Sequence, residues 1–306
     1  MRSIPLSGLF TSEGVPSWYH LAYANLFPTR LHIGKGLPVI RKAYATDKGA
    51  IAYWVNEIEP HAVTLVFLPG LTADHRLFQK QVEYFERLCN VFVWDAPAHA
   101  DSRPFELSFS LEDMACWLYE IFDVEGIERP ILVGQSMGGY VSQAFMQRFP
   151  GEVAGFVSID SAPLQRQYYS SWELWLLSRM TSVYRAYPHE PLVQAGVKGC
   201  ATTEYGQGLM REIWSVYNHE EFSVLAGYGY RILAAAIERD LPYEIDCPVQ
   251  LICGEKDAAG STRRYNRAWA KKTGYPLAWI AAAGHNSNAD CPDEVNTLIA
   301  ALAGLG

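Results

Sequence analysis

The sequence predicts an α/β fold, in which a mostly parallel β-sheet is covered by helices on both faces. Short apolar runs, such as residues 63–68 and 91–94, alternate with amphipathic helical stretches. Strands that are apolar at every position are typical of a parallel sheet that is buried on both sides. A glycine-flanked serine follows one of these runs, and an aromatic-rich helical segment, residues 161–243, interrupts the alternation near the middle of the chain. These observations together favour a sheet with one large insertion.

The predicted elements follow one another from residue 39 onward. Residues 39–46 and 50–56 are expected to form a hairpin, because Asp47-Lys48-Gly49 between them is a favourable turn sequence. Apolar strands are expected at residues 63–68, 91–94, 131–133, 153–159, 249–253 and 277–280, and helices at 77–88, 111–122, 140–146 and 293–303. Residues 1–36 are rich in aromatic side chains but show no clear period, and no role is assigned to them.

Composition excludes several classes of function. The 306 residues are 49% hydrophobic with a formal charge of −8, so a folded core is expected and no basic stripe indicates nucleic-acid binding. No stretch is apolar for long enough to span a membrane, and no secretory signal is recognisable. The six cysteines form no C-x-x-C pair and no zinc-like spacing, so neither metal nor cofactor is expected. A cytoplasmic location is the expectation, and the oligomeric state is not indicated.

Residues 130–140, PILVGQSMGGY, carry the most informative motif. The apolar run 131–133 ends at Gly134-Gln135-Ser136-Met137-Gly138, and a helical pattern follows at once. A strand, a G-x-S-x-G turn and a helix form the context of a nucleophile elbow, which exposes a serine hydroxyl on a strained turn. The first N–H groups of the helix would point toward a negative oxygen at Ser136.

A serine hydroxyl needs a base to remove its proton, and the base needs an orienting group. Asp257 follows the apolar strand 249–253, and His285 follows the strand 277–280. The order Ser136, Asp257, His285 is the one associated with this elbow. Asp160, which ends the preceding strand, is the alternative orienting acid.

The chain resembles the α/β-hydrolase superfamily in four segments. These are Leu68-Pro69-Gly70-Leu71, residues 95–102, residues 134–139, and the pair Gly254–Asp257 and Gly284-His285. The resemblance implies an eight-stranded, mostly parallel sheet, with residues 1–160 and 244–306 as the core and 161–243 as a helical cap. It implies that Ser136 is the nucleophile, His285 the general base and Asp257 the orienting acid. The oxyanion hole then maps to the N–H groups of Leu71 and Met137.

Two segments depart from the family pattern. Pro69-Gly70 stands where the family often has His-Gly, and Pro97-Ala98-His99-Ala100 stands where it often has Pro-Gly-His-Gly. Alanine at positions 98 and 100 predicts a turn that does not need a positive φ. We expect Asp95, His99 and Ser102 to hold this loop together.

The resemblance implies hydrolysis through an acyl-enzyme, most simply of a carboxylic ester, without cofactor or metal. Lactones, thioesters and carbon–carbon bonds are alternative targets, and a ligand receptor that retains the three residues is the alternative outside enzymes. The aromatic cap favours a small to medium apolar or aromatic small-molecule substrate. Trp172, Trp175 and Tyr228 are the cap residues expected to contact it. Asp74 and His75 are expected to form a surface pair rather than to contact the substrate.

Overall fold

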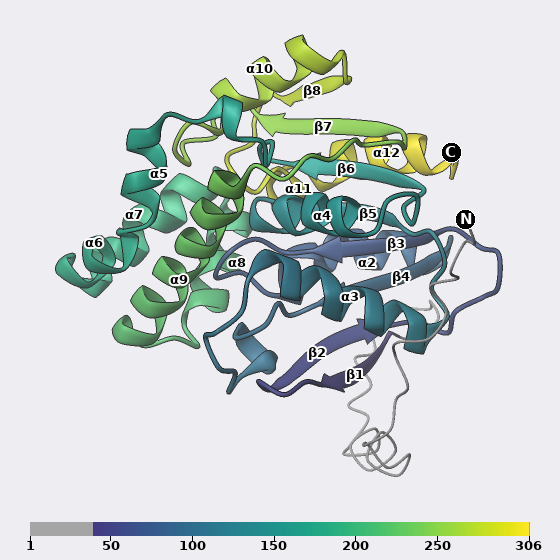
Figure 1. The fold of residues 1–306 in the computed structure, drawn as a ribbon, viewed down its shortest axis with the longest axis horizontal. Coiled ribbons are helices and arrows are strands. Elements are labelled where there is room, and N and C mark those ends of the chain that lie inside the picture. Colours follow the sequence, from purple (N-terminus) through teal and green to yellow (C-terminus); the bar gives the residue numbers. More distant parts are fainter. Residues whose placement is uncertain (1–38, 306) are drawn as a thin grey trace, which may run out of the picture.

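A computed structural model describes residues 39–305 of the chain, so the segment 1–36 lies outside the described residues. Figure 1 shows one sheet with helices on both faces, and further helices gathered beyond one end of the strands. This arrangement confirms the predicted α/β architecture. It also places the inserted helices on the side where ligands bind parallel sheets, beyond the carboxyl ends of the strands.

Within residues 39–305 the sheet has eight strands, in the order β1-β2-β4-β3-β5-β6-β7-β8. The strands β1 and β2 form an antiparallel hairpin, β2 pairs antiparallel with β4, and all later pairs are parallel. The strands span Ile40–Ala45 (β1), Ala50–Val55 (β2), Thr64–Leu68 (β3), Asn90–Trp94 (β4), Ile131–Gln135 (β5), Gly155–Ile159 (β6), Val249–Gly254 (β7) and Leu277–Ile280 (β8). Every residue of β3, β4, β5 and β6 is buried, as their apolar sequences predict.

The core has two layers, one on each face of the sheet. In β3, Leu65 and Phe67 point to one layer and Val66 and Leu68 to the other, since successive side chains of a strand alternate. One layer packs against α3 (Leu111–Glu125), α4 (Met137–Arg148) and α10 (Thr262–Thr273). The other packs against the 3₁₀ turn η1 (His75–Phe78), α2 (Gln79–Phe85) and α12 (Pro292–Ala303).

Five helices and a short 3₁₀ turn, η3 (Arg166–Tyr168), lie between β6 and β7. The helices are α5 (Ser171–Leu177), α6 (Met180–Ala186), α7 (His189–Cys200), α8 (Glu204–Trp214) and α9 (His219–Arg239). The long helix α9 begins with a capping box in which Asn218 accepts the N–H of Glu221. Another 3₁₀ turn, η2 (Ala100–Ser102), follows β4, and the short helix α11 (Ser287–Asp290) precedes α12.

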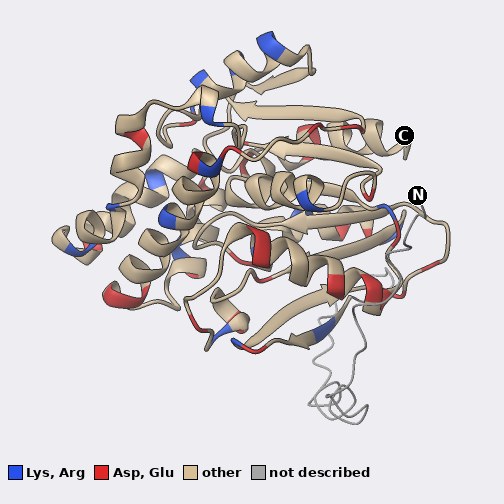
Figure 2. Cartoon of the chain, in the orientation of Figure 1, with Lys and Arg blue, Asp and Glu red and all other residues tan. Residues whose placement is uncertain are grey.

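The distribution of charged residues and the character of the helices can be described for residues 39–305. Acidic and basic residues are scattered over the described part of the chain, and Figure 2 shows no continuous basic stripe. None of the helices within residues 39–305 combines the length and apolar character that a membrane crossing requires.

Candidate active site

Ser136 lies on the turn between β5 and α4, with φ 49° and ψ −115°. A non-glycine residue rarely adopts this conformation, so the surroundings must enforce it. The flanking glycines make the turn possible. A Cβ atom on Gly134 would lie 2.4 Å from the backbone of Gly138, and a Cβ atom on Gly138 would lie 1.8 Å from the carbonyl oxygen of Leu68. The G-x-S-x-G spacing is therefore a steric requirement of this turn.

The three residues of the predicted catalytic set meet beyond the ends of the strands. His285 Nε2 lies 2.9 Å from Ser136 Oγ, and His285 Nδ1 lies 2.9 Å from Asp257 Oδ2. The other oxygen of Asp257 accepts the N–H of Ala259 at 2.7 Å. The Asp257 side chain is fully buried and His285 is nearly so. The geometry is that of a serine whose proton can pass to an imidazole that is itself held by a carboxylate.

Charge around His285 favours its protonated form. Burial lowers the pKa of His285, but the charge and hydrogen bond of Asp257 outweigh this effect and leave the pKa above its ordinary value. Asp160, the alternative acid, makes no hydrogen bond to His285. Its two oxygens accept the N–H groups of Gly254 at 2.7 Å and Ser287 at 2.8 Å. Burial and the nearby charge of Asp257 raise the pKa of Asp160 to about 7.

Gln135, directly before the serine, supports the histidine loop. Its Nε2 donates to the carbonyl oxygen of His285 at 2.8 Å and to Asn286 Oδ1 at 3.1 Å. Sequence reasoning missed this residue because it fills a variable position of the motif. The available signal was a buried amide at the end of a strand that is otherwise apolar, since buried polar groups need partners.

The backbone N–H groups of Leu71 and Met137 have no acceptor among residues 39–305. Leu71 follows β3, and Met137 is the first residue of α4. Their side chains both contact α9 at Gly229, where a Cβ atom would lie 2.3 Å from Leu71 Cδ1 and 2.9 Å from Met137 Cε. The absence of a side chain at Gly229 therefore lets α9 cover this loop.

A cavity of about 150 Å³ opens beside Ser136 and His285. Its walls come from the loop after β3 and from α6 to α9, and no Asp, Glu, Lys or Arg of the described residues lines it. The larger apolar and aromatic side chains that line it are Leu71, Tyr184, Leu192, Met210, Trp214, Phe222 and Tyr230. The site thus joins a polar hydrogen-bonded chain to an uncharged, mostly apolar cavity.

The three cap residues expected to contact substrate do not line this cavity. They are Trp172, Trp175 and Tyr228. Trp172 and Trp175 are 64% and 44% exposed and stack on each other on the outer side of α5, since residues three apart share a helix face. Tyr228 is buried, and its hydroxyl group bonds to the backbone of Phe109 instead. Aromatic content therefore did not predict which faces of the inserted helices line the cavity.

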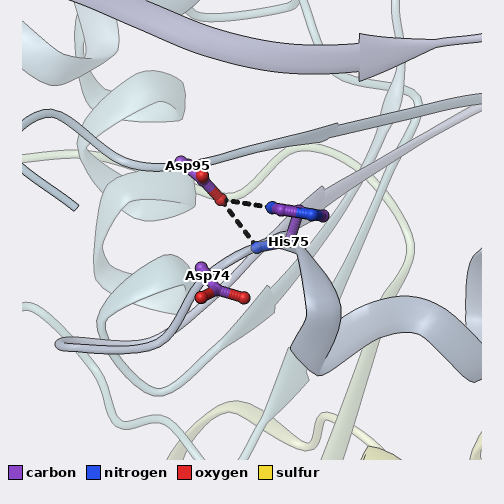
Figure 3. Close-up of side chains that lie close together, drawn as sticks. All are labelled: Asp74, His75 and Asp95. Carbon is purple, nitrogen blue, oxygen red and sulfur yellow. Dashed lines mark hydrogen bonds and ion pairs between the residues drawn. The ribbon is translucent and has the colours of Figure 1, made fainter. Parts of the chain in front are cut away.

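Asp74 and His75 are not a surface pair, and this expectation was wrong. Asp74 is fully buried and accepts hydrogen bonds from the backbone and guanidinium groups of Arg76. Figure 3 shows the backbone N–H and Nδ1 of His75 both directed at Asp95, each at 2.8 Å from Oδ1. The ring of His75 also stacks on Trp54. These contacts fix the segment that follows Leu71.

Among residues 39–305, two clusters of side chains have the composition of a metal site. In the first, Asp74, His75 and Asp95 lie close together, but protein donors already occupy their oxygens. The second joins Asp160 and Asp257 to Cys253, a buried thiol whose pKa is raised by burial. Both carboxylates there are also engaged by protein groups. Neither donor set fits a metal without breaking these hydrogen bonds.

The turn after β4 also departs from its prediction. Ala98 and Ala100 have φ values of 68° and 34°, so the turn uses the positive φ that alanine was expected to avoid. Tertiary contacts hold the turn: Ser102 Oγ donates to the Asp95 carbonyl oxygen, and Asp95 Oδ2 accepts the N–H of Asp101. The local preference of alanine is overridden by these bonds.

The strand order and the serine turn together define an α/β-hydrolase, and sequence comparison agrees. Residues 65–298 match the sequence model of the Alpha/beta hydrolase family, so the chain belongs to this family. A serine O-succinyltransferase of Frateuria aurantia is 39% identical over 72 residues, which cover 22% of this chain but only 20% of that protein. A protein of Cronobacter turicensis named as a putative carbamate hydrolase, RutD, is 24% identical over 80% of this chain and 93% of its own length.

Solved structures show the same fold at low sequence identity. The enol-lactonase of Burkholderia xenovorans LB400 superposes with a TM-score of 0.68 over 86% of this chain and 99% of its own, at 21% identity. Membership of this family shows that the protein is a hydrolase, and it leaves the substrate open.

Proposed function

We propose that this protein is a serine hydrolase that cleaves a carboxylic ester of a small to medium apolar or aromatic substrate through an acyl-enzyme. The observation that carries the proposal is the hydrogen-bonded chain from Ser136 Oγ through His285 to Asp257, with both contacts at 2.9 Å. These distances lie within the range that general-base activation of a serine needs.

In the proposed mechanism, His285 removes the Ser136 proton while Oγ attacks the ester carbonyl carbon. Asp257 orients the imidazole and stabilises the imidazolium, which agrees with its effect on the pKa of His285. The imidazolium then protonates the leaving alcohol, and the acyl group remains on Ser136. Water, activated by His285, attacks this ester and releases the acid.

The backbone N–H groups of Leu71 and Met137 are proposed to hold the developing oxyanion. Both groups lack an acceptor within the described part of the chain, and both belong to residues beside Ser136 in the cavity wall or elbow. Donors that are fixed before the reaction stabilise the transition state without reorganising, and each contributes about 3 kcal/mol in comparable sites. The contacts of His75 with Asp95 keep the segment after Leu71 in place.

Residues 161–243 are proposed to act as a cap that forms the substrate cavity. An apolar cavity of about 150 Å³ holds a group of about the size of benzene. A substrate carboxylate would find no Lys or Arg in the lining, so desolvating it there would be unfavourable. The cavity therefore favours uncharged esters with short acyl or aromatic groups.

The test is turnover of p-nitrophenyl acetate and p-nitrophenyl butyrate by the wild type and by Ser136→Ala. Ser178→Ala, at the exposed end of α5, is the matched control because it removes a hydroxyl group that does not line the cavity. The proposal expects turnover by the wild type and the control, and a loss of about 10⁴-fold or more in Ser136→Ala. Equal rates for Ser136→Ala and the wild type would remove the assignment, and tight ligand binding with negligible turnover would favour a receptor.

A further inference from the structure

The carboxylate of Asp290 joins the inserted helices to the loop that carries His285. Asp290 Oδ2 accepts the N–H of Gly284 at 2.8 Å, directly beside His285. The same carboxylate accepts the N–H groups of Thr202 and Thr203, each at 2.9 Å, and the Thr203 hydroxyl at 2.7 Å. Thr202 and Thr203 form the turn between α7 and α8. One side chain thus bonds both segments.

Further hydrogen bonds tie the same two segments together. The N–H of Asn286 donates to the carbonyl oxygen of Cys200 at 2.8 Å, and Thr202 Oγ1 donates to the carbonyl oxygen of Ala282 at 2.5 Å. The loop around His285 is therefore held on one side by the α7–α8 turn. On the other side it is held by Gln135, which donates to the carbonyl oxygen of His285.

Asp290 is buried, and no Lys, Arg or His of residues 39–305 forms an ion pair with it. Its charge is satisfied by neutral N–H and hydroxyl donors alone. Hydrogen bonds to an ionised acceptor are short and strong, and a buried acceptor that loses them is strongly penalised. The arrangement of these donors therefore resists displacement of either segment.

We propose that Asp290 is a positioning residue for His285, through which the inserted helices help to set the catalytic imidazole. The proposal rests on the function proposed above. It follows that the α7–α8 turn is a fixed support of the catalytic loop, and that displacing this turn displaces His285 from Ser136 and Asp257. Asp290 itself does not contact the reacting atoms.

Asp290→Asn tests the proposal from the side of the catalytic loop. The amide has nearly the same size, but its NH₂ group would face N–H and hydroxyl donors, so part of the network must open. A small misplacement of a catalytic group reduces the rate strongly. We expect kcat for p-nitrophenyl butyrate to fall by about tenfold to 100-fold, while KM, which reflects the cavity, changes by less than about twofold.

Substitutions of Thr203 test, from the side of the inserted helices, whether the α7–α8 turn positions His285 through Asp290. Thr203→Ala removes one donor to Asp290 and the N-cap of α8, since Thr203 Oγ1 also accepts the N–H of Gly206. Thr203→Ser keeps the hydroxyl and is expected to recover most of the kcat that Thr203→Ala loses. Ser110→Ala is the matched control, because it removes a comparable N-cap from α3 and Ser110 does not line the cavity. It should lower the melting temperature without lowering kcat.

One readout does not depend on ester hydrolysis. The proton between His285 Nδ1 and Asp257 is expected to give a low-field ¹H NMR signal that Asp257→Asn lacks. Asp290→Asn should weaken or shift it. An unchanged signal and unchanged kcat in a folded Asp290→Asn variant would overturn the positioning role. If the wild type shows the signal but hydrolyses no ester, the proposed function is wrong. The effect of Asp290→Asn on the signal would still decide whether Asp290 positions His285.

Discussion

Substituting Asp160 by asparagine should change how the stability of the protein depends on pH. Asp160 is buried beside Asp257, and burial together with this negative neighbour raises its pKa from 3.8 to about 7. In the unfolded chain the same carboxyl has its ordinary value. The folded protein therefore binds a proton here that the unfolded chain releases between about pH 4 and pH 7.

The sign and size of the pH dependence follow from the linkage between proton binding and folding. Because the folded-state pKa is raised, Asp160 favours folding when protonated. This contribution is fully present below about pH 4 and is lost as the pH rises from there through about 7. With pKa values of 3.8 and about 7, the loss between pH 5 and pH 8 is about 2 to 3 kcal/mol. An asparagine side chain at this position does not ionise. The unfolding free energy of Asp160→Asn, relative to wild type, should therefore rise by about 2 to 3 kcal/mol from pH 5 to pH 8.

The substitution Asp160→Asn also changes hydrogen bonding, which shifts the unfolding free energy by about the same amount at every pH. Asp160 accepts N–H groups from Gly254 and Ser287 on separate oxygens, and an amide can accept only one of them. The lost bond destabilises the variant by about 1–3 kcal/mol at every pH. The pH dependence of the difference therefore reports the ionisation of Asp160 together with its electrostatic effect on the pKa of His285.

Urea unfolding followed by tryptophan fluorescence at pH 5, 6, 7 and 8 measures the effect. The exposed Asp246→Asn serves as the matched control, and its stability relative to wild type is expected to stay flat. A difference between Asp160→Asn and wild type that stays constant within about 0.5 kcal/mol would refute the reasoning, because a carboxyl with an ordinary pKa contributes no such slope.

Three further predictions concern the site and its turns. Asp257→Asn should lower kcat by about 10⁴-fold and move the acidic inflection of kcat/KM to lower pH, since Asp257 raises the pKa of His285; rates with p-nitrophenyl butyrate across pH decide this. Gly138→Ala should prevent the elbow from forming, because its Cβ would lie 1.8 Å from the Leu68 carbonyl oxygen, and a soluble, fully active variant would contradict the steric argument. Ala98→Gly should raise the unfolding free energy by about 0.5–1 kcal/mol, because glycine adopts a φ of 68° without strain. An unchanged or lower midpoint of thermal melting would contradict this prediction.

The central strands of the sheet were predictable because their sequences are almost entirely apolar. Runs such as β3 and β4 have no alternating pattern, which is typical of strands buried on both faces, and each predicted run is a strand in the structure. The hairpin β1–β2 followed from its turn sequence. Helix α10 was missed, because its sequence is strongly polar and buries only Tyr265, Asn266 and Trp269. The short helix α11 offered too few residues for a periodic signal.

The site was predictable where chemistry dictates residue type and turn geometry dictates spacing. The serine turn is one example, since a side chain on Gly138 would clash with the backbone of Leu68. Asp257 and His285 followed from their places after two strands, because parallel strands bring such loops to one edge. The hydrogen bonds that support them come from Gln135, Asp160 and Asp290, which reach across loops distant in sequence. Such partners depend on tertiary packing, so the sequence at most indicates a polar residue at a strand end, as at Gln135, and does not indicate which group it binds.

Side-chain direction on the inserted helices could not be predicted. Trp172 and Trp175 face solvent, whereas Trp214 and Phe222 line the cavity. Which face of a helix points to the cavity depends on how α5 to α9 pack together, and aromatic composition alone carries no such information. The expectation that Asp74 lies at the surface was wrong for a similar reason. Arg76 supplies the hydrogen-bonding partner that allows the carboxylate to be buried.

The central claim is that Ser136 forms a covalent acyl-enzyme with the help of His285 and Asp257. The most direct measurement is mass spectrometry of the protein after it is mixed with p-nitrophenyl butyrate and quenched with acid within the first turnovers. The account predicts a mass increase of one butyryl group on the peptide that contains Ser136, and no such increase in Ser136→Ala. A butyryl group found on another residue, or rapid release of p-nitrophenol with no acylated protein under conditions that trap acyl-enzymes, would contradict it.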